Sequence, residues 1–418
     1  MRHRIDDQFV LLRVGPGGPE GPVATYLRAF AGWLRQQGYK RDYVMFHLVL
    51  AASFSKWLKH KHTRLLRNRI TFQHAVRFLN WRNKRRRRDP HDPALIRHFM
   101  EFLRSAKVIP AEKMLRRQVT PTDRYLDAYE EYLREERAVT KATIANHIPF
   151  VRSFLRACFG SGPPKISSIE AKDVVRFVQR QAGRLGLGRA KIMTTALRSF
   201  LRYLRYTGEV TLDLAAAVPT VANWSMSTIP RAIAPDQVRQ LLISMDRRTP
   251  KGLRDYAILL LLARLGVRAC EVVALELDDI DWGTGQLRVR GKGGRAAELP
   301  LPEDVGRAIA AYVRRGRPAT ESRRVFIRTR APYRGFQNSL AVCTLVANAL
   351  KRAGIKSPTW GAHQFRHGLA SEMLRHDASL AEIGDVLGHR HRDTTNIYAK
   401  VDLKALRSLA QPWPGHVP

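Results

Sequence analysis

The chain has 418 residues, of which 44% are hydrophobic, so it is long enough for roughly two to four domains and too apolar to be disordered. Its 73 lysines and arginines against 36 acidic residues give a formal net charge of +37, which predicts binding to a polyanion such as nucleic acid. The longest apolar run, residues 257–263, is too short to cross a bilayer, the first residues lack a signal-peptide pattern, and the 3 cysteines lack a C-x-x-C spacing. We therefore expect a cytoplasmic protein with reduced thiols and no membrane partner.

Residues 1–118 are predicted to begin with a flexible segment and to continue as a basic helical DNA-binding domain. Residues 1–20 end in GPGGPEGP, a composition typical of a flexible lead-in. Helical spacing of apolar residues follows over 21–118, and the 26 basic against 8 acidic residues of 1–118 leave a charge of +18. The densest basic run, RNKRRRR at 82–88, fits a solvated linker and direct phosphate contact equally well.

Residues 119–213 are predicted to form a second helical domain. Four amphipathic stripes and a GSGPP loop at 160–164 are typical of a helical bundle. Its first stripe, YLDAYEEYLR from Tyr125, is similar to YLRAFAGWLR from Tyr26. This echo indicates either a second copy of the same bundle or two amphipathic helices that share a stripe by convergence. Prolines interrupt residues 214–232, which are expected to be a linker between domains.

The next segment combines a helix break with a predicted β-hairpin. A helical run ends at Gly266, and Arg268 begins a second helical run that carries Val272 and Leu275. The string QLRVRGKGGRAAELPLP then predicts a strand, a Gly-rich turn and a second strand, with Lys292 at the turn. A lysine on such a hairpin tip can swing to a substrate oxygen.

Cationic residues near the end of the sequence surround a tyrosine. His363 and Arg366 are three residues apart and project from one face of a predicted helix. His389 follows a glycine that ends the next predicted helix, and Tyr398 comes nine residues later. A phenol, with a reference pKa of about 10, needs a positive environment to become a good nucleophile, and arginines and histidines supply it. The same donors stabilise the spread charge of a phosphoryl-transfer transition state, so the set predicts phosphoryl transfer to tyrosine.

Together these positions resemble the tyrosine recombinase (phage integrase) family. The motifs GVRACEV, RGKGGR, HQFRH, LGHR and NIYAKV occur in the family's order and at similar intervals. The resemblance implies a mainly α, multi-domain protein, in which helical DNA-binding bundles precede an α+β catalytic domain with a small β-sheet or hairpin. It implies a core-binding (SAM-like) domain at 119–213, the catalytic domain at 233–410 and a C-terminal tail at 411–418. The matching catalytic positions are Arg268, Lys292, His363, Arg366, His389 and Tyr398.

The resemblance also implies what these residues do. Arg268 and Arg366 would clamp the scissile phosphate, because a guanidinium can donate two parallel hydrogen bonds to phosphate oxygens. Tyr398 would be the nucleophile that attacks the phosphorus, leaving a 3′-phosphotyrosyl intermediate and a free 5′-hydroxyl. Lys292 would protonate the departing 5′-oxygen. No cofactor, ATP or metal ion is implied, because the phosphodiester energy is kept in the bond between protein and DNA.

The remaining polar residues of interest are histidines and carboxylates. By resemblance, His363 would assist proton transfer around the tyrosine, and His389 would donate a hydrogen bond to a phosphate oxygen. Glu271 and Asp255 are expected either to support the site or to be ordinary helix-surface carboxylates. His367 stands where the family also has a histidine, and we expect it to pack or orient its helix.

The predicted function is that of a site-specific DNA recombinase or integrase of a mobile element. By resemblance, it would act on double-stranded DNA recombination sites as a homotetramer, through a Holliday junction, with room for accessory recombination proteins. A type IB topoisomerase shares the chemistry but would relax any supercoiled plasmid as a monomer. A non-catalytic architectural DNA-binding protein is the other alternative, and it would form no covalent adduct with DNA.

Overall fold

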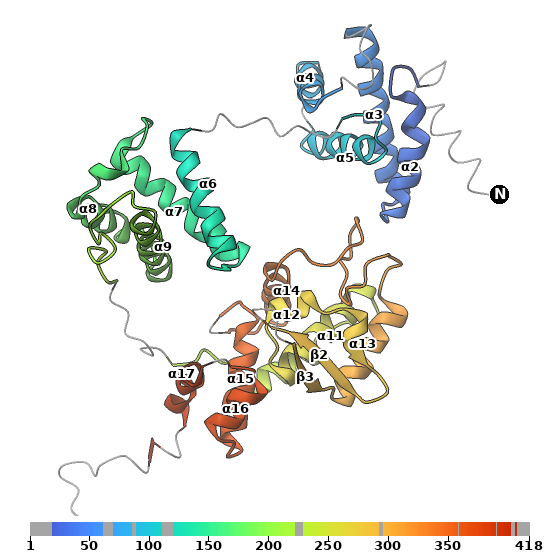
Figure 1. Cartoon of the computed structure of the whole chain (residues 1–418). Coiled ribbons are helices and arrows are strands. Elements are labelled where there is room, and N and C mark those ends of the chain that lie inside the picture. The colour runs from blue at the N-terminus through green and yellow to red at the C-terminus, as the bar shows by residue number, and fades with distance from the viewer. Residues whose placement is uncertain are drawn as a thin grey trace, which may run out of the picture. The chain divides into compact units, whose positions relative to one another are not determined.

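The computed structural model describes residues 19–61, 70–85, 89–110, 120–221, 229–291, 296–357, 359–389, 391–402 and 406–407. The chain divides into two compact units, one formed by residues 1–111 with 228–418 and the other by residues 112–227. Helices dominate both units, and the strands lie in the C-terminal part of the first (Figure 1). The predicted fold class, mainly α with a small β-sheet, is therefore confirmed.

The N-terminal part of the first unit is a helical bundle with an apolar core of its own. Aromatic rings fill this core: Phe30 and Phe99 lie 4.8 Å apart, and Phe54 and Phe78 lie 5.3 Å apart. The helices predicted for this segment are present. Three residues of the basic run at 82–88 lie outside the described residues. The elements are η1 (Ala24–Tyr26), α2 (Leu27–Gln36), α3 (Arg41–Lys61), α4 (Phe72–Asn83) and α5 (Asp92–Ser105).

The second unit is also a helical bundle. Its first helix begins at Thr120, whose hydroxyl accepts the backbone N–H of Asp123 at 3.2 Å, while the Asp123 carboxylate accepts the backbone N–H of Thr120 at 3.1 Å. Arg152 donates to the same carboxylate, so this helix start is tied to the next helix. The elements are α6 (Pro121–Glu135), α7 (Lys141–Phe159), η3 (Ile166–Ser168), α8 (Ala171–Ala182) and α9 (Leu187–Tyr206).

The C-terminal part of the first unit contains a three-stranded antiparallel sheet of order β1-β2-β3. Strand β2 buries Leu287 and Val289 on one face, which is the alternation expected of a half-buried strand. It pairs with β3 so that Arg290 faces Ala296, which confirms the predicted strands, while Lys292 in the turn lies outside the described residues. The elements up to this sheet are α10 (Pro235–Ile243), α11 (Pro250–Leu265), α12 (Ala269–Ala274), η4 (Leu277–Asp279), β1 (Ile280–Asp281), β2 (Gln286–Arg290) and β3 (Ala296–Pro300).

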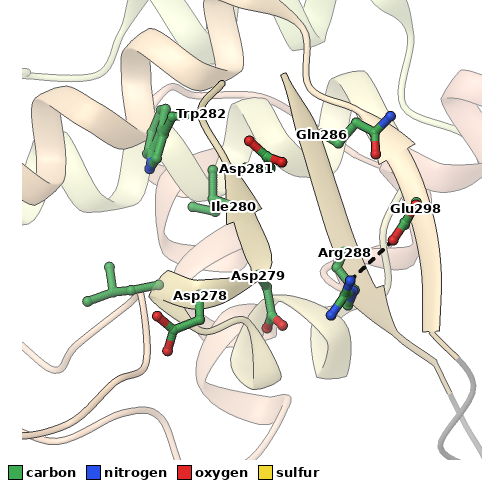
Figure 2. Close-up of a pocket in the computed structure, with 9 residues that line it drawn as sticks. Asp278, Asp279, Ile280, Asp281, Trp282, Gln286, Arg288 and Glu298 are labelled. Atoms are coloured by element: carbon green, nitrogen blue, oxygen red, sulfur yellow. Dashed lines mark hydrogen bonds and ion pairs between the residues drawn. The ribbon is translucent and has the colours of Figure 1, made fainter. Parts of the chain in front are cut away.

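A hollow of about 450 Å³ opens beside this sheet (Figure 2). Acidic side chains line much of it, including Asp278 and Asp281, and Glu298 faces it from β3. Arg288 is the cation drawn in this view, and it donates to Glu298 at 3.3 Å. Because carboxylates repel phosphate, this hollow does not suit a DNA backbone, and the candidate active site must be sought elsewhere.

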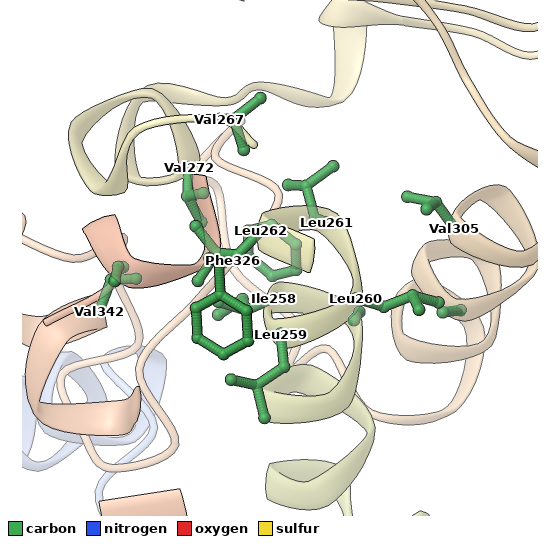
Figure 3. Close-up of a cluster of buried hydrophobic side chains, with 14 of the residues drawn as sticks. Ile258, Leu259, Leu260, Leu261, Leu262, Val267, Val272, Val305, Phe326 and Val342 are labelled. Carbon is green, nitrogen blue, oxygen red and sulfur yellow. The ribbon is translucent and has the colours of Figure 1, made fainter. Parts of the chain in front are cut away.

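The main core is the buried apolar cluster around α11 (Figure 3). Residues 257–262 of this helix are all buried, so apolar side chains surround it on every side. Val305 on α13, Val342 on α14 and Phe326 from the intervening loop pack against it. The apolar run that is too short for a membrane is thus the centre of a folded domain. The elements after β3 are α13 (Glu303–Arg315), α14 (Leu340–Arg352), α15 (His363–Arg375), α16 (Leu380–Val386), α17 (Arg392–Thr395) and η5 (Asn396–Val401).

A second, small cluster lies between α15, α16 and η5. It consists of the buried residues Ala370, Ile383, Leu387 and Tyr398, and we refer to it as the small cluster. Helix α16 starts after Ser379, whose hydroxyl accepts the backbone N–H of Glu382 at 3.2 Å. Across the described part of the chain, every helix is too short or too polar to cross a bilayer.

Candidate active site

Arg268 lies at a helix junction that the main core holds in place. Helix α11 ends at Gly266, whose φ of +58° is a left-handed conformation that glycine adopts at little cost. Arg268 then precedes α12 and donates to Glu271 twice, from its backbone N–H at 2.7 Å and from Nη1 at 2.8 Å. Its Nη2 donates to the carbonyl of Gly388 at 3.5 Å. The side chain is 34% exposed, so it is fixed in direction yet open to a ligand.

Arg366 is buried on α15 and spans the space between two helix ends. Its Nη1 donates to the carbonyl of Gly266 at 2.9 Å, and its Nη2 donates to the carbonyl of Leu387. Only 2% of the residue is exposed, and among the described residues its Nε has no hydrogen-bond partner. A buried donor without a partner is costly, so this guanidinium has a hydrogen-bond donor to offer to an incoming oxygen.

Tyr398 lies on the short helix η5 and faces α15. Its side chain is 1% exposed and belongs to the small cluster. The phenolic oxygen lies 3.0 Å from Nδ1 of His367, and the two rings meet edge to face with centroids 5.6 Å apart. The phenol is thus buried against α15 and held beside His367.

Three histidine rings gather around this phenol. His363 and His367 are one turn apart on α15, and their ring centroids lie 4.4 Å apart. The ring of His389 lies parallel to that of Tyr398 with centroids 6.4 Å apart. Its Nδ1 lies 2.7 Å from Oγ1 of Thr395, which fixes the orientation of the ring.

Burial and neighbouring cations keep these histidines neutral. Burial is the main cause that lowers the pKa of His363, and Arg366 and Arg268 lower it further. The pKa values of His367 and His389 fall to about 4, again mainly through burial, with Arg366 adding to both effects. All three imidazoles are therefore uncharged at neutral pH and can accept as well as donate a hydrogen bond.

The arginine and the phenol influence each other. Burial, with the charge of Arg268 adding to it, lowers the pKa of Arg366 to about 10, so the guanidinium is still charged at neutral pH. Burial raises the pKa of Tyr398 overall, and the positive charge of Arg366 offsets part of that rise. The phenol thus lies within the field of a guanidinium, which is the environment that a developing phenolate requires.

The structure brings five of the six predicted positions into one cluster, and the sixth, Lys292, lies outside the described residues. Of the two carboxylates, Glu271 holds Arg268, so the supporting role is the one that its contacts favour. Asp255 instead pairs with Lys251 and Arg254, and neither of these cations belongs to the cluster. Within the described part of the chain, no three His, Cys, Asp or Glu residues are placed to hold a metal ion.

His367 contacts the phenol directly, which the sequence did not show. It was expected to pack or orient its helix, yet its Nδ1 is within hydrogen-bond distance of the Tyr398 phenol. The available signal was its spacing, because His363 and His367 are four residues apart and so lie on the same face of a helix. What the spacing could not show is that η5 brings the phenol to this face.

Comparisons with known proteins agree with this geometry. The model of the Phage integrase family matches residues 231–404. "Putative integrase/recombinase y4rA" of Sinorhizobium fredii is 54% identical over 415 residues, which cover 99% of each chain. "Tyrosine recombinase XerD" of Mycobacterium tuberculosis is 30% identical over 312 residues, which cover 70% of this chain and 97% of that one.

Among solved structures, the XerH site-specific recombinase bound to its palindromic difH substrate, in a post-cleavage complex, has the same fold. It matches with a TM-score of 0.55 at 16% identity and covers 74% of this chain and 92% of that one. The likeness to y4rA extends over nearly the whole length, and the cluster of arginines, histidines and tyrosine occupies the region that the family model matches. This chain therefore belongs to the phage integrase family of tyrosine recombinases, enzymes that cleave and rejoin DNA.

Proposed function

We propose that Tyr398 is the nucleophile of this recombinase and that Arg268 and Arg366 clamp the scissile phosphate. Attack by the phenolic oxygen forms a 3′-phosphotyrosyl bond and releases a 5′-hydroxyl, and reversal of the step on a new partner strand rejoins the DNA. Lys292 protonates the leaving 5′-oxygen, His363 assists proton transfer around the tyrosine, and His389 donates a hydrogen bond to a phosphate oxygen. Because the bond energy is conserved in the adduct, the reaction proceeds without ATP or a metal ion.

One observation carries this proposal: two guanidiniums and a phenol from three separate stretches converge. Arg366 donates to the carbonyls that end α11 and α16, and Arg268 reaches Gly388 at the same place. The Nε of Arg366 keeps an unpaired donor, and the Arg366 charge acts on Tyr398. A phosphodiester supplies the oxygen acceptors that such an arrangement fits.

The test is covalent trapping on DNA. Nicked duplexes prepared from fragments of the host genome would be incubated with the protein in EDTA, so that the released 5′ segment diffuses away and the adduct accumulates. We expect an adduct with wild type and none with Tyr398→Phe, which removes only the reactive oxygen. Sequencing the attached 3′ ends identifies the recombination site. An adduct that persists in Tyr398→Phe would overturn the assignment of the nucleophile.

The number of strands cut argues for a homotetramer on DNA. Exchange between two duplexes breaks four strands, and each chain contributes one Tyr398 in this proposal, so four copies are needed. Sedimentation of the covalent complex assembled on two DNA sites should therefore give four chains. Accessory proteins are required if the purified protein alone cannot recombine DNA that carries the sites identified by trapping.

Relaxation of any supercoiled plasmid by a monomer would instead favour a topoisomerase. A cytoplasmic location, where chromosomal or mobile-element DNA is accessible, is part of the same proposal.

We also propose that the N-terminal bundle, residues 21–118, extends the contact with DNA beyond that of the core-binding domain, residues 119–213. The two similar sequence stretches also bury equivalent residues: Phe30 and Tyr129 occupy matching positions, and both are fully buried. The excess positive charge of residues 1–118 favours phosphate contact. Footprints of the full chain and of a chain beginning at Thr120 should differ in length, and identical footprints would end this part of the proposal.

A further inference from the structure

We infer that His367 is a catalytic residue for strand cleavage, in which it accepts the phenolic proton of Tyr398 as that oxygen attacks the phosphorus. This inference rests on the proposed role of Tyr398 as the nucleophile. It assigns to His367 a chemical step, where the sequence alone indicated a packing role.

The geometry selects His367 from the three histidines of the cluster. Its Nδ1 is 3.0 Å from the phenolic oxygen, which is the distance of a direct proton transfer. His389 lies with its ring parallel to the phenol at 6.4 Å and directs Nδ1 to Thr395 instead. His363 lies beside His367 on α15 with ring centroids 4.4 Å apart, and among the described residues its ring contact is with His367 rather than with the phenol.

The surroundings keep His367 ready to accept a proton. Burial, together with His363 and Arg366, lowers its pKa to about 4, so the imidazole is neutral and Nδ1 can carry a free lone pair. The proton then resides on the other ring nitrogen, Nε2, and the phenol donates to Nδ1. An incoming phosphodiester adds a negative charge beside these cations, which raises the basicity of the imidazole at the moment of attack. Among the described residues, the other charged and titratable groups around His367 are His363 and Arg366 on α15, Arg268, Cys270 and Glu271 at α12, His389 after α16 and Tyr398 on η5.

The cleavage step balances in atoms and charge. The bond between the Tyr398 oxygen and phosphorus forms as the bond between phosphorus and the 5′-oxygen breaks. The phenolic proton moves to Nδ1 of His367, and the departing 5′-oxygen takes a proton from a separate acid, the role proposed for Lys292. During religation the 5′-hydroxyl attacks, the phenolate leaves, and the His367 imidazolium returns the proton to it.

The inference is tested by single-turnover cleavage of the nicked duplex, with His367→Asn as the central variant. The Asn amide can still form a hydrogen bond near the position of Nδ1 but cannot take up a proton. We expect a rate reduced by about 10²-fold or more, with DNA affinity unchanged. The fall of the rate on acidification toward pH 4, where His367 takes up a proton, should also be flattened. His376→Asn is the matched control, because His376 lies at the exposed end of the same helix and should leave the rate unchanged.

Two further arms separate proton acceptance from other roles. A duplex with sulfur in place of the scissile 5′-oxygen has a leaving group that departs without protonation, so His367→Asn should stay slow on it, whereas a lost acid would be rescued. In His367→Ala, added imidazole should restore part of the rate, which a merely structural role would not allow. The inference would be overturned if the sulfur substrate rescued His367→Asn, or if this variant cleaved the ordinary duplex as fast as wild type or faster. A faster rate would show that the contact with His367 only restrains Tyr398. Failure of the proposed function is distinct, because then wild type itself would form no adduct at Tyr398.

Discussion

The main core and the small cluster contribute to the site in different ways. The main core is large, surrounds α11 and fixes Arg268 at the end of that helix. The small cluster has four buried residues, one of which is Tyr398 itself. Arg366 joins the two, since it donates to Gly266 on one side and Leu387 on the other. The proposed phosphate clamp is thus tied to the large core, whereas the proposed nucleophile lies in the much smaller cluster.

The strongest test of this division removes the residue that joins both regions. In Arg366→Ala, the carbonyls of Gly266 and Leu387 lose their donor and the phosphate loses a charged clamp. We expect adduct formation to fall by roughly 10³-fold or more, because charge stabilisation in a buried site is worth about 3–4 kcal/mol for a single donor and a guanidinium supplies several. Arg375→Ala is the control on the same helix, where an exposed pair with Glu372 should be nearly neutral. Similar losses in both variants would contradict the division.

The main core and the small cluster can be compared by making the same leucine-to-alanine substitution in each. Leu259→Ala in the main core should lower the free energy of unfolding by about 3 kcal/mol, because the residue is fully buried in dense packing. Leu387→Ala in the small cluster should lower it by about half as much and should instead speed hydrogen exchange over Arg392–Thr395 and Asn396–Val401. Urea unfolding of the full chain, with hydrogen exchange to locate the change, gives both values. Equal effects at the two sites would mean that Tyr398 is as firmly held as Arg268.

Local patterns allowed the elements on both sides of this comparison to be predicted. The glycine that ends α11 and the strands around the hairpin each depend on residues within a few positions of one another. The five predicted catalytic positions that the structure describes also converge, because the family resemblance supplied long-range information that spacing alone does not contain. Local signals therefore sufficed for the scaffold but not for the contacts within the site.

Those contacts depend on residues far apart in sequence. His367 and Tyr398 are 31 positions apart, and Arg366 and Gly266 are 100 apart, so their pairing follows from how α11, α15 and η5 pack. Asp255 illustrates the same limit, since its sequence context suggested a site support or a surface carboxylate. It is instead a buried partner of Arg254, whose Nη1 donates to the carbonyl of Ile327.

The fixed direction of Arg268 offers a finer test of the rigid side. Glu271 is 6% exposed and accepts two hydrogen bonds from Arg268, so Glu271→Gln weakens the hold without removing the cation. We expect adduct formation to fall about 10-fold, which corresponds to roughly 1.4 kcal/mol, with little loss of DNA affinity. Glu372→Gln is a close control, because it carries the same three-residue ion-pair spacing on the exposed surface of α15. A full rate in Glu271→Gln would show that the clamp needs no positioning by this carboxylate.

The smallest expected effect concerns acid, and it should appear on the side of the nucleophile. His367 and His389 have pKa values of about 4 in the folded chain against about 6.5 when unfolded, so the unfolded state binds more protons below pH 6.5. The contribution of these two histidines to the free energy of unfolding should therefore be constant above pH 6.5. It should decline as the pH falls from 6.5 toward 4. Allowing for solvent screening of these half-buried rings, we expect a loss of about 1 kcal/mol and a melting temperature lower by roughly 2–4 °C at pH 5 than at pH 7.5. His389→Asn should reduce this difference and His376→Asn should not, because only the former removes a ring of the cluster around Tyr398. If hydrogen exchange at pH 5 instead increased first around α11, the acid-sensitive region would be the main core, and the two regions would not differ as proposed.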